Sequence, residues 1–121
     1  MNGIQSLSVR LDLKQMAENA GDAARLLKAL ANEKRLMILC ILIEGELSVG
    51  ELNARLDLSQ SALSQHLAVL REDGLVRTRR ESQTIYYSIA PGPAVRLIET
   101  LHDLYCNLGP CLTARGQANG G

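Results

Sequence analysis

Apolar and polar positions follow a helical period over the first third of the chain. Between residues 14 and 31, apolar side chains recur every three or four positions and predict a first amphipathic helix. Asn32 is suited to cap a second helix that begins at Glu33. The run LMILCILI, residues 36–43, is apolar on every side, so we expect this second helix to be central and buried.

Two shorter helices follow, and each has a start signal. Ser48 and Glu51 have the spacing of a capping box, which opens a helix that ends at about Leu56. After a turn, Ser59 is suited to cap a longer helix, and Gly74 is placed to end it. The pattern therefore predicts two capped helices separated by only a few residues.

The period then changes from 3.6 to 2. LVRTRR and TIYYSI predict two strands around a polar turn at residues 81–83, hence a β-hairpin. Pro91 and Pro93 break the chain before a final amphipathic helix, from Ala94 to about residue 108. The whole pattern predicts a mainly α domain of about five helices plus a two-stranded hairpin, over residues 14–113. Residues 1–13 are expected to form an N-terminal arm, and residues 114–121 have the composition of a disordered tail.

Composition limits the class of protein. The chain has 121 residues, enough for one domain, and its longest apolar run of eight is far short of the ~20 residues that cross a bilayer. The N-terminus lacks the order of a signal peptide, so we expect a cytoplasmic protein. There the three cysteines would stay reduced, and a purely structural disulfide is not expected. The net charge is zero, but RTRR at residues 77–80 forms a local positive spot.

The helix that follows Ser59 has an unusual polar face. Its side chains are short, uncharged and rich in hydrogen-bond donors and acceptors, where an ordinary surface helix shows Lys and Glu. Two short capped helices followed by a basic hairpin predict a winged helix-turn-helix, in which this helix enters the DNA major groove. Gln can contact an adenine edge with two hydrogen bonds, and Ser can contact base edges or phosphate. The predicted DNA-binding residues are Gln60, Ser61, Ser64, Gln65, His66, Arg77, Arg79 and Arg80.

Simpler interpretations of the same residues remain open. The polar face could merely solvate an exposed helix, and the arginines could keep an edge strand from pairing with a neighbour. A winged helix could also act as a protein-interaction module without DNA. An enzyme is not expected, because the chain has no Gly-rich phosphate loop and no nucleophile–base signature.

Three segments together resemble the ArsR family of winged-helix repressors. They are LLKALANEKRLMILCIL, LSVGELNARLDLSQSALSQHLAVLREDGLV and the hairpin motif RR-x-x-Q-T-x-Y-Y, and the similarity covers residues 26–108. The resemblance implies a homodimer built from the first and last helices, which binds an inverted-repeat operator and blocks transcription. The similarity is greatest to the sulfide- and redox-responsive branch, which pairs a cysteine of the second helix with one of the last. Here these are Cys40 and Cys106.

The resemblance leads to a hypothesis about sensing. We expect oxidation or persulfidation to bridge Cys40 and Cys106 through sulfur and so to switch off operator binding. His102, one helical turn before Cys106, could make that thiol more acidic. The alternative for Cys40 is a small, inert core residue, which is the usual role of a cysteine in an apolar helix.

Metal sensing is well known in the family and gives the main alternative. The family's metal-binding cysteine cluster is missing, since this chain has SVGELNARL there, and His102 lacks a second histidine and carboxylate at the zinc-binding spacing. We therefore expect no metal site and no cofactor. Arsenite or another thiophilic metalloid could still be bound by three thiols, those of Cys40, Cys106 and Cys111.

Overall fold

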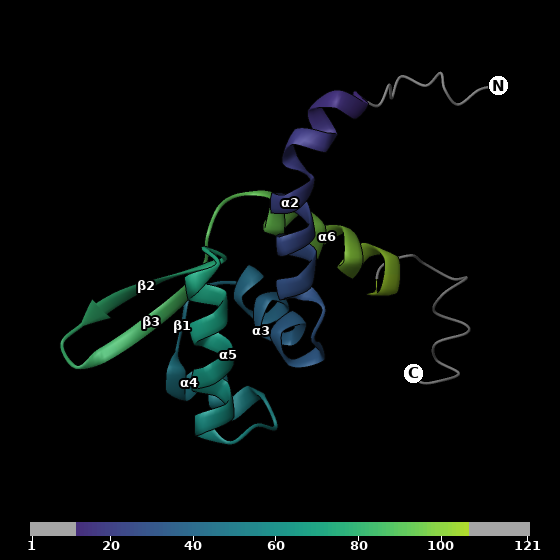
Figure 1. Ribbon diagram of the computed structural model, residues 1–121. Coiled ribbons are helices and arrows are strands. Elements are labelled where there is room, and N and C mark those ends of the chain that lie inside the picture. Colours follow the sequence, from purple (N-terminus) through teal and green to yellow (C-terminus); the bar gives the residue numbers. More distant parts are fainter. Residues whose placement is uncertain (1–11, 107–121) are drawn as a thin grey trace.

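The structure, a computed structural model, describes residues 12–106 of the chain. Within this range it has five helices and three short strands (Figure 1). In chain order they are α2 (Leu13–Leu30), α3 (Glu33–Ile43), β1 (Leu47–Ser48), α4 (Val49–Arg55), α5 (Gln60–Glu72), β2 (Val76–Glu81), β3 (Thr84–Ile89) and α6 (Pro93–Cys106). The predicted tail and nearly all of the predicted arm lie outside the described residues.

The predicted helix starts are confirmed by their hydrogen bonds. The Asn32 side chain accepts from the backbone N–H groups of the first turn of α3, at 2.9 and 3.0 Å. At α4, the Glu51 N–H donates to the Ser48 hydroxyl at 3.1 Å, and the Glu51 carboxylate accepts from the Ser48 N–H at 2.8 Å. Ser59 accepts from the backbone of α5 at 3.1 Å. Each cap satisfies N–H groups that a helix leaves without partners at its start.

The end of α5 is also the one predicted. Gly74 has φ +74°, a conformation that disfavours a side chain. Its N–H donates to the Arg71 carbonyl at 3.0 Å, and the Leu75 N–H donates to the Leu70 carbonyl at 2.8 Å. This pair of bonds is a Schellman motif, which reverses the chain and leads it directly into β2.

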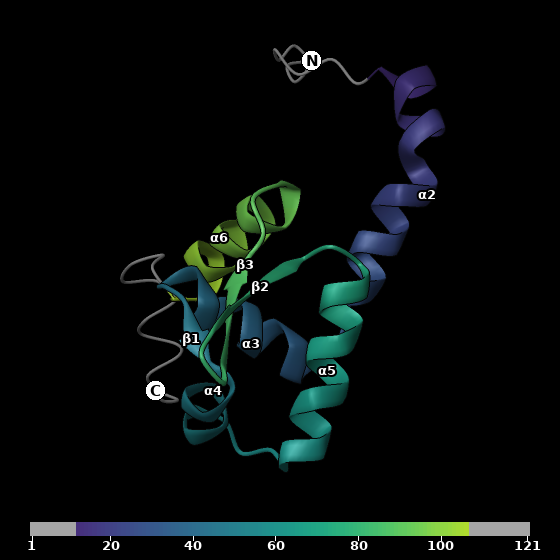
Figure 2. The same cartoon turned by 90° about the vertical axis from the view of Figure 1, so that its left-hand side faces the viewer.

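The core is centred on α3. This helix contacts α2, α5, α6 and β3, so elements lie around most of its circumference (Figure 2). Its buried residues pack in one cluster with side chains of α5 and α6, and the fully buried members of that cluster are Ile38, Leu39, Leu42, Leu52, Leu63, Leu67, Leu70 and Ile98. The expectation of a central second helix is confirmed.

The sheet differs from the prediction by one strand. The predicted hairpin is present, with β2 and β3 antiparallel from Val76↔Ile89 to Glu81↔Thr84. A third strand, β1, pairs with β3 on its other side and gives the order β1-β3-β2. The sequence did not indicate β1, because two residues are too few to show a period of 2. Its pairing joins the base of the hairpin to the start of α4.

Apolar side chains remain exposed on the first and last helices. Leu13, Met16 and Leu27 of α2 are more than half exposed, and Tyr105 of α6 is 75% exposed. Figure 1 shows the N-terminal half of α2 extending beyond the rest of the subunit. These are the two helices that the resemblance predicts to form a dimer. Among the described residues, no helix has both the length and the apolarity needed to cross a bilayer.

The buried face of α5 should dominate its contribution to stability. Leu63 is fully buried, so Leu63→Ala should lower the free energy of unfolding by about 2–5 kcal/mol. Ser64→Ala, at the exposed neighbouring position, should change it by less than about 0.5 kcal/mol. Urea unfolding at one protein concentration measures both. Similar losses in the two variants would contradict the assigned orientation of α5.

Candidate nucleic-acid interface and thiol cleft

The polar face of α5 points away from the core. The side chains of Leu63, Leu67 and Leu70 are buried, and the helical period turns Gln60, Ser61, Ser64 and Gln65 outward, where all four are exposed. His66 is half-buried at the edge of this face. Within residues 12–106, the side chains of Gln60, Ser64 and Gln65 make no hydrogen bond to the protein. Their donors and acceptors are therefore available to a ligand.

The turn before α5 is held by a residue that the sequence analysis did not single out. The Asn53 amide, in α4, donates to the Leu58 carbonyl at 2.9 Å. This bond spans the turn between the two helices of the helix-turn-helix. An amide in a short helix gives no distinctive signal in the sequence, because its partner is a backbone carbonyl.

The arginines of the wing, the hairpin formed by β2 and β3, do not share one face. Side chains alternate along a strand, so Arg77 and Arg79 lie on one side of β2 and Arg80 lies on the other. All three are exposed. In the part of the chain that the structure describes, no carboxylate lies within ion-pairing distance of Arg77 or Arg80. The positive charge of these two arginines is thus not neutralised by any side chain within residues 12–106.

Arg79 is in a different situation. Its Nε and Nη2 donate to the two carboxylate oxygens of Glu46, at 3.0 and 2.8 Å, and its Nη1 donates to Glu81 at 2.9 Å. Its guanidinium also lies 4.6 Å from the centroid of the Tyr86 ring. The hydrogen bonds from Arg79 hold the pKa of Glu46 below its ordinary value and raise the pKa of Arg79. Glu46 was not among the residues predicted from the sequence, since it lies outside the predicted helices and strands.

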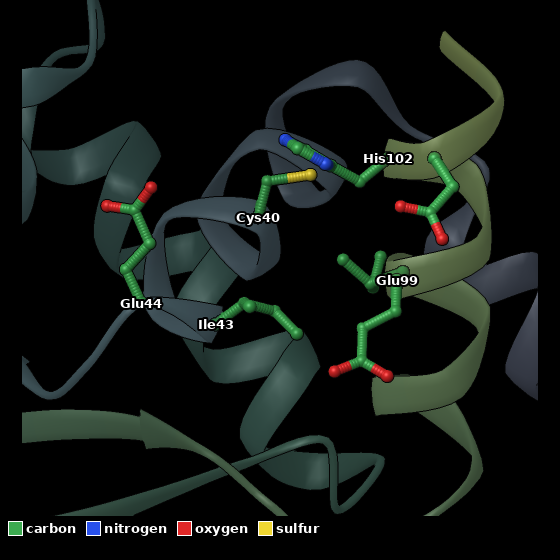
Figure 3. A pocket seen from close by; sticks show the side chains of 7 residues that line it. Cys40, Ile43, Glu44, Glu99 and His102 are labelled. Atoms are coloured by element: carbon green, nitrogen blue, oxygen red, sulfur yellow. The ribbon is translucent and has the colours of Figure 1, made fainter. Parts of the chain in front are cut away.

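A cleft of about 150 Å³ lies between α3 and α6, beside the residues through which these helices pack. Figure 3 shows Cys40 of α3 and His102 of α6 both directed into the space between the two helices. The other residues that line the cleft are Ile43, Glu44, Ile98, Glu99 and Asp103. His102 was predicted to act on Cys106, and the structure places it in the cleft that Cys40 lines.

The two predicted thiols are free and lie in different environments. Cys40 is half-buried, whereas Cys106, the last described residue, is exposed at the end of α6. Burial raises the pKa of the Cys40 thiol above its ordinary value, and the negative charge of a nearby Cys106 thiolate raises it further. The fold therefore brings the two thiols close enough for one to feel the charge of the other. Cys111 lies outside the described residues, and within them no group of three or more His, Cys, Asp or Glu side chains is arranged to hold a metal ion.

Comparison with known proteins identifies the family. Residues 32–78 match the family described as bacterial regulatory protein, arsR family. The transcriptional activator HlyU of Vibrio cholerae is 58% identical over 96 residues, which cover 79% of this chain and 89% of that protein. The biofilm growth-associated repressor of Agrobacterium fabrum is 51% identical, over 79% of this chain and 82% of that protein.

Solved structures extend the similarity to the fold, and one of them is described as homodimeric. Reduced HlyU from Vibrio cholerae superposes with a TM-score of 0.73 at 59% identity, over 77% of this chain and 98% of that one. A homodimeric winged helix-turn-helix DNA-binding domain from Mycobacterium bovis, a possible ArsR-family regulator, gives a TM-score of 0.66 at 34% identity, over 81% and 89% of the two chains. The family and the named relatives are described as transcription regulators. The chain belongs to the ArsR family of winged helix-turn-helix DNA-binding regulators, within the group that contains HlyU and the biofilm growth-associated repressors.

Proposed function

We propose that this regulator is a homodimeric repressor that leaves its inverted-repeat operator when Cys40 and Cys106 become bridged through sulfur. The observation that carries the proposal is the position of the two thiols. A half-buried thiol on the central helix faces the helix whose end bears an exposed thiol within electrostatic range. The same central helix packs against α5, which carries the polar face.

The exposed face of α5 supports the DNA-reading part of the proposal. Gln60, Ser61, Ser64, Gln65 and, at the edge, His66 contact base edges and nearby phosphates in the major groove. Arg77 and Arg80, whose charges are not neutralised within the described protein, contact phosphates beside the groove. Arg79 belongs to the same wing and contributes through its contacts with Glu46 and Glu81.

The exposed apolar side chains of α2 and α6 support the dimer. Large apolar groups on these two helices are left in water by the single chain, and a second copy would cover them. A two-fold axis through this surface repeats the reading head, and two such heads about 34 Å apart match consecutive turns of one face of DNA. An inverted repeat is the sequence that this symmetry requires.

An organic persulfide, RSSH, is a suitable oxidant for the thiol pair. The exposed Cys106 thiolate attacks the terminal sulfur of RSSH, which gives a Cys106 persulfide and releases the thiol RSH after protonation. The Cys40 sulfur then attacks Sγ of Cys106 and forms a disulfide with release of H₂S. Two thiols are oxidised and one persulfide is reduced. Transfer of further sulfur atoms gives a longer bridge, which relaxes the Cα–Cα limit of about 7 Å for a direct disulfide.

The bridge acts on affinity by joining two helices. It ties α3, which supports α5, to α6, which carries part of the exposed apolar surface. A change in the angle between these helices alters the spacing of the two reading heads. A 100-fold loss of operator affinity requires a preference of only ~2.7 kcal/mol for the wrong geometry.

The reading helix and the wing should respond differently to mutation. Gln65→Ala should reduce the discrimination between operator and random DNA by about 1–3 kcal/mol, because a base contact is lost. Arg80→Ala should weaken binding to both DNAs alike and reduce the salt slope by about 0.9, because a phosphate contact is lost. Fluorescence anisotropy over a range of KCl concentrations measures both. Equal losses on the two DNAs from Gln65→Ala would contradict its role.

The thiol pair is tested by operator binding before and after treatment with an organic persulfide or polysulfide. The wild type should lose about 100-fold in affinity, whereas Cys40→Ser and Cys106→Ser should keep binding because neither can close the bridge. Cys111→Ser is the control and should respond like the wild type. A response that survives in both single variants would exclude the pair. A response to persulfide that also requires Cys111 would place this third thiol in the switch, and release of DNA by arsenite that requires all three thiols would favour the metalloid site.

The two thiols should also react in a fixed order. At neutral pH, iodoacetamide should alkylate the exposed Cys106 well before Cys40, whose thiolate is disfavoured by burial. Cys40 should begin to react only at a pH above the ordinary thiol range, and Cys106→Ser should move that onset to lower pH because the neighbouring negative charge is removed. Peptide mass spectrometry over a pH series measures both rates. Faster alkylation of Cys40 would invalidate the order of attack proposed above.

A further inference from the structure

The Glu46–Arg79 ion pair joins the wing to the body of the domain. Arg79 is in the middle of β2, and Glu46 lies 33 residues earlier, in the segment between α3 and β1. Two N–H groups of the guanidinium meet the two oxygens of one carboxylate, at 3.0 and 2.8 Å. This two-bond geometry fixes direction as well as distance, which a single contact between flexible side chains does not.

The wing itself supplies the other contacts of Arg79. Glu81 accepts from Nη1 at 2.9 Å, and Tyr86, the partner of Arg79 in the β2–β3 register, lies under the guanidinium. Tyr86 is also the residue that pairs with Ser48 of β1. Arg79 therefore lies where the hairpin meets the two-residue strand that attaches it to the body.

The charge around Arg79 is unsuitable for a phosphate. One positive group is in contact with two carboxylates, so the cluster carries a net charge of −1 (one positive and two negative). A phosphate brought to this guanidinium would have to displace a carboxylate or approach two of them. Arg77 and Arg80 offer positive charge without that cost.

We propose that Arg79 is a positioning residue, and that its pair with Glu46 holds the wing at the angle at which Arg77 and Arg80 meet DNA together with α5. This role replaces the direct contact with DNA predicted for Arg79 from the sequence. It rests on the proposed contact between the wing and DNA. The base of the hairpin is held by packing of β3 against α3, and β1 pairs with only two residues of β3. The ion pair adds a further attachment at Arg79, level with the end of β1.

Two isosteric substitutions separate the roles. Glu46→Gln and Glu81→Gln each remove one negative charge from the same guanidinium, but only Glu46 lies outside the wing. The probe is DNA that the reduced wild-type protein selects from a random pool. Glu46→Gln should weaken binding about fivefold, at the lower end of the usual range for coupling between sites. Glu81→Gln should leave the affinity unchanged or raise it, since it removes charge without detaching the wing.

A third variant keeps the charge and removes the two-bond geometry. Arg79→Lys should bind as weakly as Glu46→Gln, because an ammonium cannot make the forked contact. Combining Glu46→Gln with Arg79→Lys should cause no further loss, as expected when both changes remove one interaction. Circular dichroism verifies the fold of each variant. If Glu46→Gln does not fold, the DNA affinity of Arg79→Lys tests the positioning role in its place.

The outcomes are distinct. If Glu46→Gln binds as tightly as the wild type or more tightly, or if Arg79→Lys retains full affinity, Arg79 is not a positioning residue. If Arg77→Ala and Arg80→Ala both leave affinity and salt dependence unchanged, the contact between wing and DNA itself is wrong. That second result would refute the proposed function of the wing, and the first would leave it intact.

Discussion

The burial of α3 is the constraint on which the rest of the structure depends. Its apolar residues can leave water only if other elements cover the helix on several sides, and α2, α5, α6 and β3 do so. The reading helix and the last helix are therefore both packed against the same support. A thiol on that support, Cys40, lies between the surface proposed to read DNA and the surface proposed to form the dimer. No separate sensing domain is needed, because the packing already links the two surfaces.

Features set by local hydrogen bonds could be predicted from the sequence. The capping residues Asn32, Ser48 and Ser59 and the terminating Gly74 act on groups within five residues, so their spacing alone defined the helix boundaries. The orientation of α5 followed from the spacing of its leucines in the same way. The residues that form the exposed polar face of α5 could therefore be predicted before the fold was known.

Features that depend on distant pairs could not be predicted in this way. Strand β1 exists because β3 lies beside it, and Glu46 matters because Arg79 is brought to it from 33 residues away. The cluster RTRR looked like a single positive patch, but the strand divides it between two faces and two carboxylates neutralise one member. His102 was assigned to Cys106 from spacing within one helix, and only the tertiary structure shows that it also lines the cleft between α3 and α6 together with Cys40. The set of candidate site residues was a prediction from the sequence and remains one, and the grouping within that set came from the tertiary structure.

The short segment at the end of α3 has two ionic connections. Glu44, which lines the cleft with Cys40, lies 3.6 Å from Arg55 of α4, and Glu46 holds Arg79 of the wing. A displacement one helical turn past Cys40 would therefore reach the first helix of the helix-turn-helix and the wing inside the same protomer. In a dimer, each protomer would then transmit a change at its own thiols to its own half-site through its own ion pairs. A dimer modified on one side only would present unequal halves to a palindrome, so its response to rising oxidant would be graded in two steps.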